Sequence, residues 1–177
     1  MSQTVRIDFA QITLQQALDL AVLIEEEARD RYSEFADSLA MHNTPEAAAF
    51  FRKMARVEEM HRAALVKQRV ERFGEAPSAF SLDQIFDIEA AEFDEARMSM
   101  SVRQALEVAM RGEVKAHDFF DRVAKLVQDP EAKALFEELR EEELEHQGYV
   151  AAELARLPPG EEPVDPRVWE DEPGSGD

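Results

Sequence analysis

Two short stretches of this sequence place a Glu three residues before a His. The first is VEEMH, with Glu58 and His61, and the second is EELEH, with Glu143 and His146. On a helix, residues three apart lie on the same face, about one turn from each other. A carboxylate and an imidazole presented together suit Fe, Mn or Zn better than Ca or Mg. Each pair is therefore a candidate metal-binding element.

The sequence marks the helices that must position these pairs. Capping boxes begin at Thr13 and Ser101, and a capping residue followed by Pro occurs at Thr44 and Asp129. Between these marks the sequence has helical periodicity and few helix-breaking residues. The predicted helices span, approximately, residues 13–42, 44–73, 101–128 and 130–157.

The remaining segments differ from the helices in composition. Residues 74–100 are long enough for a crossover, and SLDQIFDIEAAEF within them predicts a short helix capped by Ser81. Residues 158–177 are rich in Pro, Gly and acidic residues, which is typical of a flexible tail. The expected organisation is a helical bundle over residues 1–157, followed by this tail.

The helical part contains an internal repeat. A shift of 88 residues aligns eight identical residues of the first and third helices, and a shift of 85 aligns seven of the second and fourth, Glu58 and His61 among them. The chain is thus one helical hairpin used twice. Two such hairpins joined by a crossover predict an all-α fold, a four-helix bundle.

The repeat places one Glu at matching depth in every helix. Glu25 and Glu113 each lie 12 residues after their helix cap, and Glu58 and Glu143 each lie 14 residues after theirs. These residues interrupt apolar stripes, so we expect them to be buried. Four buried carboxylates would repel one another strongly, whereas two divalent cations would balance their charge.

Two alternatives accompany this interpretation. A single Glu of this kind is more often a surface residue or part of an ion pair, but that explanation does not account for six residues in a repeated register. In the fourth helix, Glu142 also lies within about one turn of His146, and only the repeat favours Glu143.

Composition excludes several classes of partner and site. The formal net charge of −19 disfavours binding to nucleic acid or to anionic membranes. The absence of Cys excludes disulfides and Cys-ligated metal centres within these residues. The sequence has no apolar run long enough to span a membrane and no signal-peptide pattern at its start, so we expect a cytoplasmic location.

Over residues 13–157 the chain resembles the ferritin-like superfamily, and most closely the rubrerythrin group of non-haem di-iron proteins. The stretches EEEARDRYSEFA, RVEEMHRAAL, GEVKAHDFF and REEELEHQGY carry the resemblance. It implies a ferritin-like bundle with two Fe ions, for which Mn or Zn could substitute. The implied metal ligands are Glu25, Glu58, His61, Glu113, Glu143 and His146.

The resemblance also assigns individual roles. Glu25 and Glu113 would be terminal ligands, one for each metal, while Glu58 and Glu143 would bridge the two ions. His61 and His146 would bind one ion each. Tyr32 would hydrogen-bond a carboxylate and orient it in catalysis, although its repeat mate Phe120 also allows a simple packing role.

The chain departs from the rubrerythrin pattern in two respects. It has no Cys for a rubredoxin-type module, and Ala116 stands where rubrerythrins tend to have an extra carboxylate. The predicted function is a di-iron oxidoreductase that oxidises Fe(II), reduces peroxide or O₂, and receives electrons from an external donor such as a rubredoxin.

Two other functions are also compatible with the sequence, and the sequence favours one state of assembly. The chain could instead bind or deliver iron with incidental ferroxidase activity, or it could bind partners through its acidic tail. Cage-forming ferritins usually continue into a fifth helix, whereas this chain breaks at Pro158 and Pro159. We therefore expect a homodimer.

Overall fold

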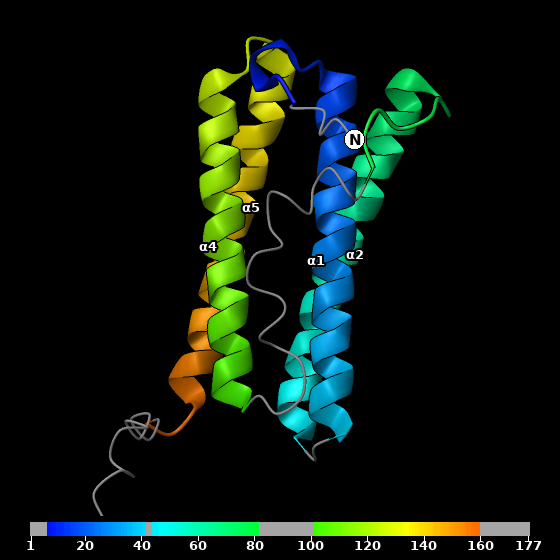
Figure 1. Cartoon of the computed structure of the whole chain (residues 1–177). Coiled ribbons are helices and arrows are strands. Elements are labelled where there is room, and N and C mark those ends of the chain that lie inside the picture. Colours follow the sequence, from blue (N-terminus) through cyan, green and yellow to red (C-terminus); the bar gives the residue numbers. More distant parts are fainter. Residues whose placement is uncertain (1–6, 42–43, 82–100, 160–177) are drawn as a thin grey trace, which may run out of the picture.

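The computed structural model describes residues 7–41, 44–81 and 101–159, and these residues form an all-α structure. A short 3₁₀ helix, η1, precedes two helical hairpins that lie side by side (Figure 1). The elements are η1 (Phe9–Gln11), α1 (Leu14–Met41), α2 (Pro45–Phe73), α4 (Val102–Leu126) and α5 (Pro130–Arg156). The predicted ferritin-like bundle is confirmed, and the helix ends lie within two residues of those expected from the sequence.

Two segments for which the sequence predicts a structure lie outside the described residues. They are the short helix expected after Ser81 and residues 160–177 of the expected tail. Among the residues that are described, no helix is both long and apolar enough to cross a membrane.

Both predicted capping boxes form. At the start of α1, the Thr13 N–H donates to Gln16 Oε1 at 3.0 Å, and the Gln16 N–H donates to Thr13 Oγ1 at 3.3 Å. Ser101 and Gln104 repeat this exchange at the start of α4. Because each box satisfies two otherwise unpaired N–H groups, it fixes where the helix begins.

The other two helix starts differ from each other. Asp129 accepts hydrogen bonds from the N–H groups of Glu131 and Ala132, as a capping residue should. Thr44 occupies the capping position before Pro45, but its hydroxyl donates to the carbonyl of Leu39 at 2.7 Å instead. This bond ties the start of α2 back to the last turn of α1.

A buried ion pair joins the start of α1 to the end of α2, at the end of the first hairpin away from its turn. Arg69 Nε donates to Asp19 Oδ1 at 2.8 Å, and both side chains are less than a tenth exposed. Arg69 also donates to the carbonyl of Gly74, and Asp19 accepts from the Ala79 N–H. Gly74 has φ of 69°, which permits the chain to turn there without strain. The segment after α2 is thereby held against α1.

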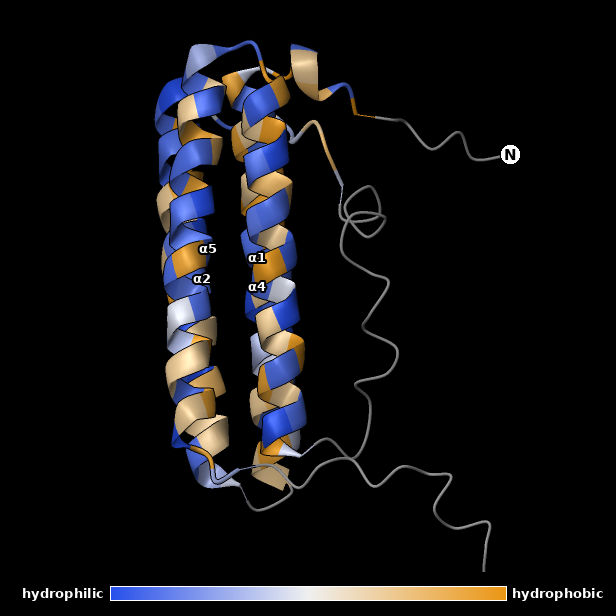
Figure 2. Cartoon of the chain, turned by 90° about the vertical axis from the view of Figure 1, so that its left-hand side faces the viewer, coloured by the Kyte–Doolittle hydropathy of each residue, from blue (hydrophilic) through white to orange (hydrophobic). Residues whose placement is uncertain are grey.

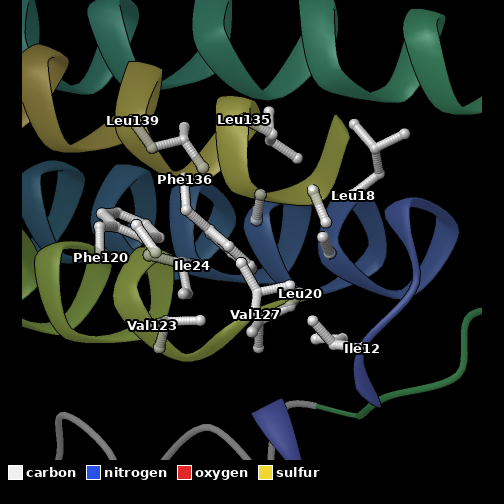
Figure 3. Packing of buried hydrophobic residues seen from close by; sticks show 14 of the residues in the cluster. Ile12, Leu18, Leu20, Ile24, Phe120, Val123, Val127, Leu135, Phe136 and Leu139 are labelled. Atoms are coloured by element: carbon white, nitrogen blue, oxygen red, sulfur yellow. The ribbon is translucent and has the colours of Figure 1, made fainter. Parts of the chain in front are cut away.

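The hydrophobic core consists of two clusters at opposite ends of the bundle. The first contains Ile24 of α1, Leu139 of α5, and the stacked rings of Phe120 and Phe136 (Figure 3). The second is built around Tyr32, together with Phe35 and Phe51. Hydrophilic and hydrophobic residues alternate along every helix, as expected for amphipathic packing (Figure 2).

Candidate metal centre

A layer of charged residues separates the two apolar clusters. Each helix contributes one Glu at this level, and each lies between a residue of the first cluster and one of the second. All four carboxylates are buried, together with one histidine: Glu25, Glu58, Glu113, Glu143 and His146. The predicted register therefore brings the four Glu residues to one level of the core. Their burial, which the sequence only implied, is present in the structure.

His146 lies among three of these carboxylates. Its Nδ1 is 3.2 Å from Glu58 Oε1, 3.3 Å from Glu113 Oε2 and 3.6 Å from Glu143 Oε2. None of these approaches has hydrogen-bond geometry, because Nδ1 has no hydrogen-bond partner within the described part of the chain. Convergence without hydrogen bonding is the arrangement expected of ligands around a shared ion.

Three groups of side chains could each hold a cation. In each group, the candidate ligand atoms lie within 4.8 Å of one another. The groups are Glu58, His61 and His146; Glu25, His61 and Glu142; and Glu113, Glu143 and His146. Together they contain all six residues expected from the sequence, and they add Glu142.

Several polar atoms of this layer have no hydrogen-bond partner among the described residues. They are Glu25 Oε2, Glu58 Oε1, His61 Nδ1, and both ring nitrogens of His146. A buried polar atom left unpaired typically costs about 1–3 kcal/mol, so native proteins rarely leave several in one place. Bound cations would satisfy the two carboxylate oxygens and one ring nitrogen of each histidine. The donor set of carboxylates and imidazoles fits Fe, Mn or Zn.

The protonation of the apo layer follows from burial and repulsion. Burial raises the pKa of Glu25 well above its usual range, and the nearby Glu58 carboxylate raises it further. Burial also raises the pKa of Glu143 well above its usual range, with reinforcement from Glu113 and opposition from His146. Without metal, the layer therefore retains protons on carboxyl groups that are normally ionised at neutral pH.

Burial and the neighbouring carboxylates shift the pKa of His146 in opposite directions. Burial by itself lowers its pKa, but the carboxylates of Glu113 and Glu143 outweigh that effect and raise the pKa to about 11. In the apo protein the imidazole is therefore a cation, and it partly neutralises the layer. A metal ion would replace this proton, since only a neutral imidazole donates a lone pair.

The two histidines differ in exposure. The His146 side chain is 2% exposed, whereas that of His61 is 23% exposed. Beside His61 lies Glu142, whose side chain is 31% exposed and whose Oε2 is 3.6 Å from His61 Nδ1. Glu142 is the functional candidate that the repeat failed to select. Its only signal in the sequence is its place within about one turn of His146.

Tyr32 and Ala116 flank the layer on opposite sides. Tyr32 is buried and stacks on Phe51, with ring centroids 5.8 Å apart. No hydrogen bond joins its hydroxyl to a carboxylate of the layer within the described residues. Ala116 is buried one turn after Glu113 and packs with the first apolar cluster. The site thus has no carboxylate at this position of α4.

Comparisons with known proteins agree with this arrangement. The sequence model of the family described as rubrerythrin matches residues 16–154. A crystal structure of an uncharacterised conserved protein from Magnetospirillum magnetotacticum is 29% identical to this chain, with a TM-score of 0.69. The match covers 86% of this chain and 100% of that one. No curated protein matches the chain.

Proposed function

The chain belongs to the rubrerythrin family, and from that premise we propose that it is a non-haem di-iron oxidoreductase. It would bind two Fe ions in the charged layer, oxidise Fe(II), and reduce peroxide or O₂. The observation that supports this proposal most directly is the convergence of four buried Glu and two His whose polar atoms lack other partners.

Charge balance supports two ions over one. Four ionised carboxylates at one level carry a charge of −4, and two divalent cations supply +4 without requiring protons. A single divalent cation would leave a charge of about −2 in a buried layer, which costs several kcal/mol. Two ions also use both histidines, since His61 and His146 come from different hairpins.

The residues have distinct proposed roles. Glu58 and Glu143 would bridge the ions, Glu25 and Glu113 would each bind one, and His61 and His146 would complete one ion each. Tyr32 would orient a carboxylate. Bound Fe(II) ions would each supply one electron, so that a pair provides the two electrons that reduce one H₂O₂. The two apolar clusters limit the access of water to the layer from both ends of the bundle.

Two features favour oxidation of the metal over sustained peroxidase turnover. No Cys occurs in the 177 residues, so the proposal includes a separate electron donor such as a rubredoxin. Ala116 also removes the carboxylate that would offer a different ligand in another redox state. These features equally support the second candidate, an iron-binding or delivery protein with incidental ferroxidase activity.

Metal content and the visible spectrum test the proposal. Protein loaded anaerobically with Fe(II) should contain two ions per chain, and brief exposure to H₂O₂ should produce the charge-transfer absorption of an oxidised di-iron centre. Peroxide consumption with a rubredoxin and its reductase then separates the two candidates. Many turnovers support the oxidoreductase, and a single oxidation supports iron delivery. Failure to bind any transition metal would contradict both.

A further inference from the structure

The internal repeat makes a comparison between the two halves of the centre possible. The shift of 85 residues pairs His61 with His146, and it pairs Ala64 with Tyr149. The Tyr149 ring stacks on His146 with centroids 6.3 Å apart and 28° between the planes. Lys53 Nζ lies 5.2 Å from the centroid of that ring on α5. His146 is therefore covered by an aromatic side chain.

The equivalent position beside His61 is open. Ala64 cannot cover the imidazole as Tyr149 does, and a pocket of about 100 Å³ lies there. Its lining includes His61, Gln68, Glu138 and Glu142. This volume has room for a few water molecules. The pocket connects the His61 half of the layer to polar groups at the surface.

Glu142 stands where this pocket meets the buried layer. Its mate in the repeat is Val57, so this carboxylate has no counterpart on the His146 half. The candidate ligand atoms of Glu25, His61 and Glu142 lie within 4.8 Å of one another. Glu25 is only 2% exposed, and its Oε2 has no hydrogen-bond partner in the described chain.

A simple ion pair does not explain this cluster. The separation of 3.6 Å between His61 Nδ1 and Glu142 Oε2 is too long for a hydrogen bond, and an exposed ion pair contributes little to stability. Such a pair also leaves Glu25 Oε2 unsatisfied. A cation between the three side chains would satisfy Glu25, His61 and Glu142 together.

We propose that Glu142 is a seventh ligand of the centre, binding the ion held by Glu25 and His61 and making that half the one through which metal exchanges with solvent. This inference rests on the proposed di-iron function. It adds that the two ions are inequivalent. The ion of the Glu113, Glu143 and His146 half is enclosed, whereas the ion beside Glu142 exchanges through the pocket.

The test compares Mn(II) binding by wild type, Glu142→Gln and Glu141→Gln. Free Mn(II) is measured by electron paramagnetic resonance during an anaerobic titration. Glu141→Gln removes the same charge one residue away, where the side chain is 62% exposed and paired with Arg140. It therefore controls for long-range electrostatics. Circular dichroism of each apo protein verifies that the variant is folded.

The expected result is selective. Wild type and Glu141→Gln should bind two Mn(II) ions with affinities that agree within about twofold. Glu142→Gln should bind the first ion like wild type and the second at least about tenfold more weakly, as loss of a ligand or its support typically causes. Equal binding of both ions by Glu142→Gln would overturn the inference and leave the di-iron function intact. Loss of both ions would overturn the assignment to one half, while a wild type that binds no metal would contradict the function itself.

Discussion

The rings of His61 and His146 are nearly parallel, with centroids 5.2 Å apart and only 11° between their planes. They occupy equivalent positions in the repeat, yet one is enclosed in the core and the other borders a pocket. The two halves of the bundle are therefore related by approximate symmetry, but the side chains around the two rings differ. We therefore propose that the two halves differ in how readily they exchange metal, although they share the same types of candidate ligand.

Replacing Glu58, which we propose bridges the two ions, should weaken metal binding without unfolding the protein. Glu58→Gln keeps the size of the side chain and removes one of four buried carboxylates. We expect Mn(II) affinity to fall more than about tenfold. The free energy of unfolding of the apo protein should stay equal or rise, because the variant removes a source of repulsion toward Glu25. Equilibrium dialysis and urea unfolding measure the two effects.

Glu59→Gln is the matched control for that experiment. Glu59 is adjacent in sequence, but its side chain is 43% exposed and bonds to Arg29 and Arg62 at the surface. The Glu59→Gln variant should bind metal with the same affinity as wild type. Two tightly bound ions in Glu58→Gln would show that Glu58 is not a ligand.

The apo protein should become less stable as pH rises. The folded pKa values of Glu25 and Glu143 are raised, so the folded state binds more protons than the unfolded state once pH exceeds about 4.5, and stability falls from there. His146 adds stability that is fully present below its unfolded pKa of about 6.5 and is lost as pH rises through about 11. All three groups act in the same direction.

Metal should reverse this dependence. Binding displaces the protons held by the layer, so the stabilisation by Mn(II) should increase with pH. Urea midpoints of apo and loaded protein at about pH 5.5, 7.0 and 8.5 measure both trends. An apo protein that gains stability across this range would contradict the protonation of the layer described above.

Closing the pocket should slow the exchange of one ion. Ala64→Tyr places a ring beside His61, as Tyr149 lies beside His146, and no ligand is altered. We expect a chelator to remove the more labile Mn(II) ion several-fold more slowly, with equilibrium affinity nearly unchanged. Ala63→Tyr, at the neighbouring exposed position outside the pocket lining, is the control. Equal release rates in the two variants would exclude the pocket as the route.

Tyr32→Phe separates orientation of a ligand from packing. Phe120, the repeat mate, fills the corresponding space without a hydroxyl, so the free energy of unfolding should change by less than about 1.5 kcal/mol. If the hydroxyl orients a carboxylate once metal is bound, as we propose, metal affinity should fall by about tenfold. Unchanged affinity would leave Tyr32 as a packing residue of the aromatic cluster only. Titration with Mn(II) and thermal unfolding measure the two quantities.

The repeat explains how much of this centre the sequence could predict. Helix starts follow from local capping chemistry, and the common depth of Glu25, Glu58, Glu113 and Glu143 follows from counting residues from those caps. Both depend on interactions within one helix. The ferritin-like bundle, confirmed by the structure, then follows from two copies of one amphipathic hairpin.

The differences between the halves could not be predicted in the same way. Only the repeat favours Glu143 over Glu142, because the choice between neighbours on a helix depends on which side of α5 faces α1 and α2. Thr44 fits a capping pattern, but its hydroxyl bonds backwards to Leu39. The buried pair of Asp19 and Arg69 joins residues 50 apart, and no local pattern predicts it. The homodimer and the cytoplasmic location stay predictions.

The centre should oxidise readily but cycle slowly without a donor protein. Oxidation needs only the shared layer, which both hairpins provide. Sustained turnover needs returning electrons, and these 177 residues contain no Cys to bind an iron module that could deliver them. We expect one fast oxidation of the di-Fe(II) protein by H₂O₂ in stopped flow, followed by slow turnover that a rubredoxin accelerates. Fast repeated turnover without a donor protein, or inertness toward both H₂O₂ and O₂, would contradict this prediction.

Ala116 offers a direct way to change that behaviour. Ala116→Glu places a carboxylate one turn after Glu113, and Ala116→Gln adds the same volume to the first apolar cluster without the charge. Both variants should lose stability through overpacking, by about 1–3 kcal/mol. Only Ala116→Glu can supply another anionic ligand, so only it should accelerate peroxide turnover with rubredoxin relative to wild type. Equal turnover by the Glu and Gln variants would show that a carboxylate at residue 116 does not control cycling. The delivery of electrons would then be the step that limits turnover.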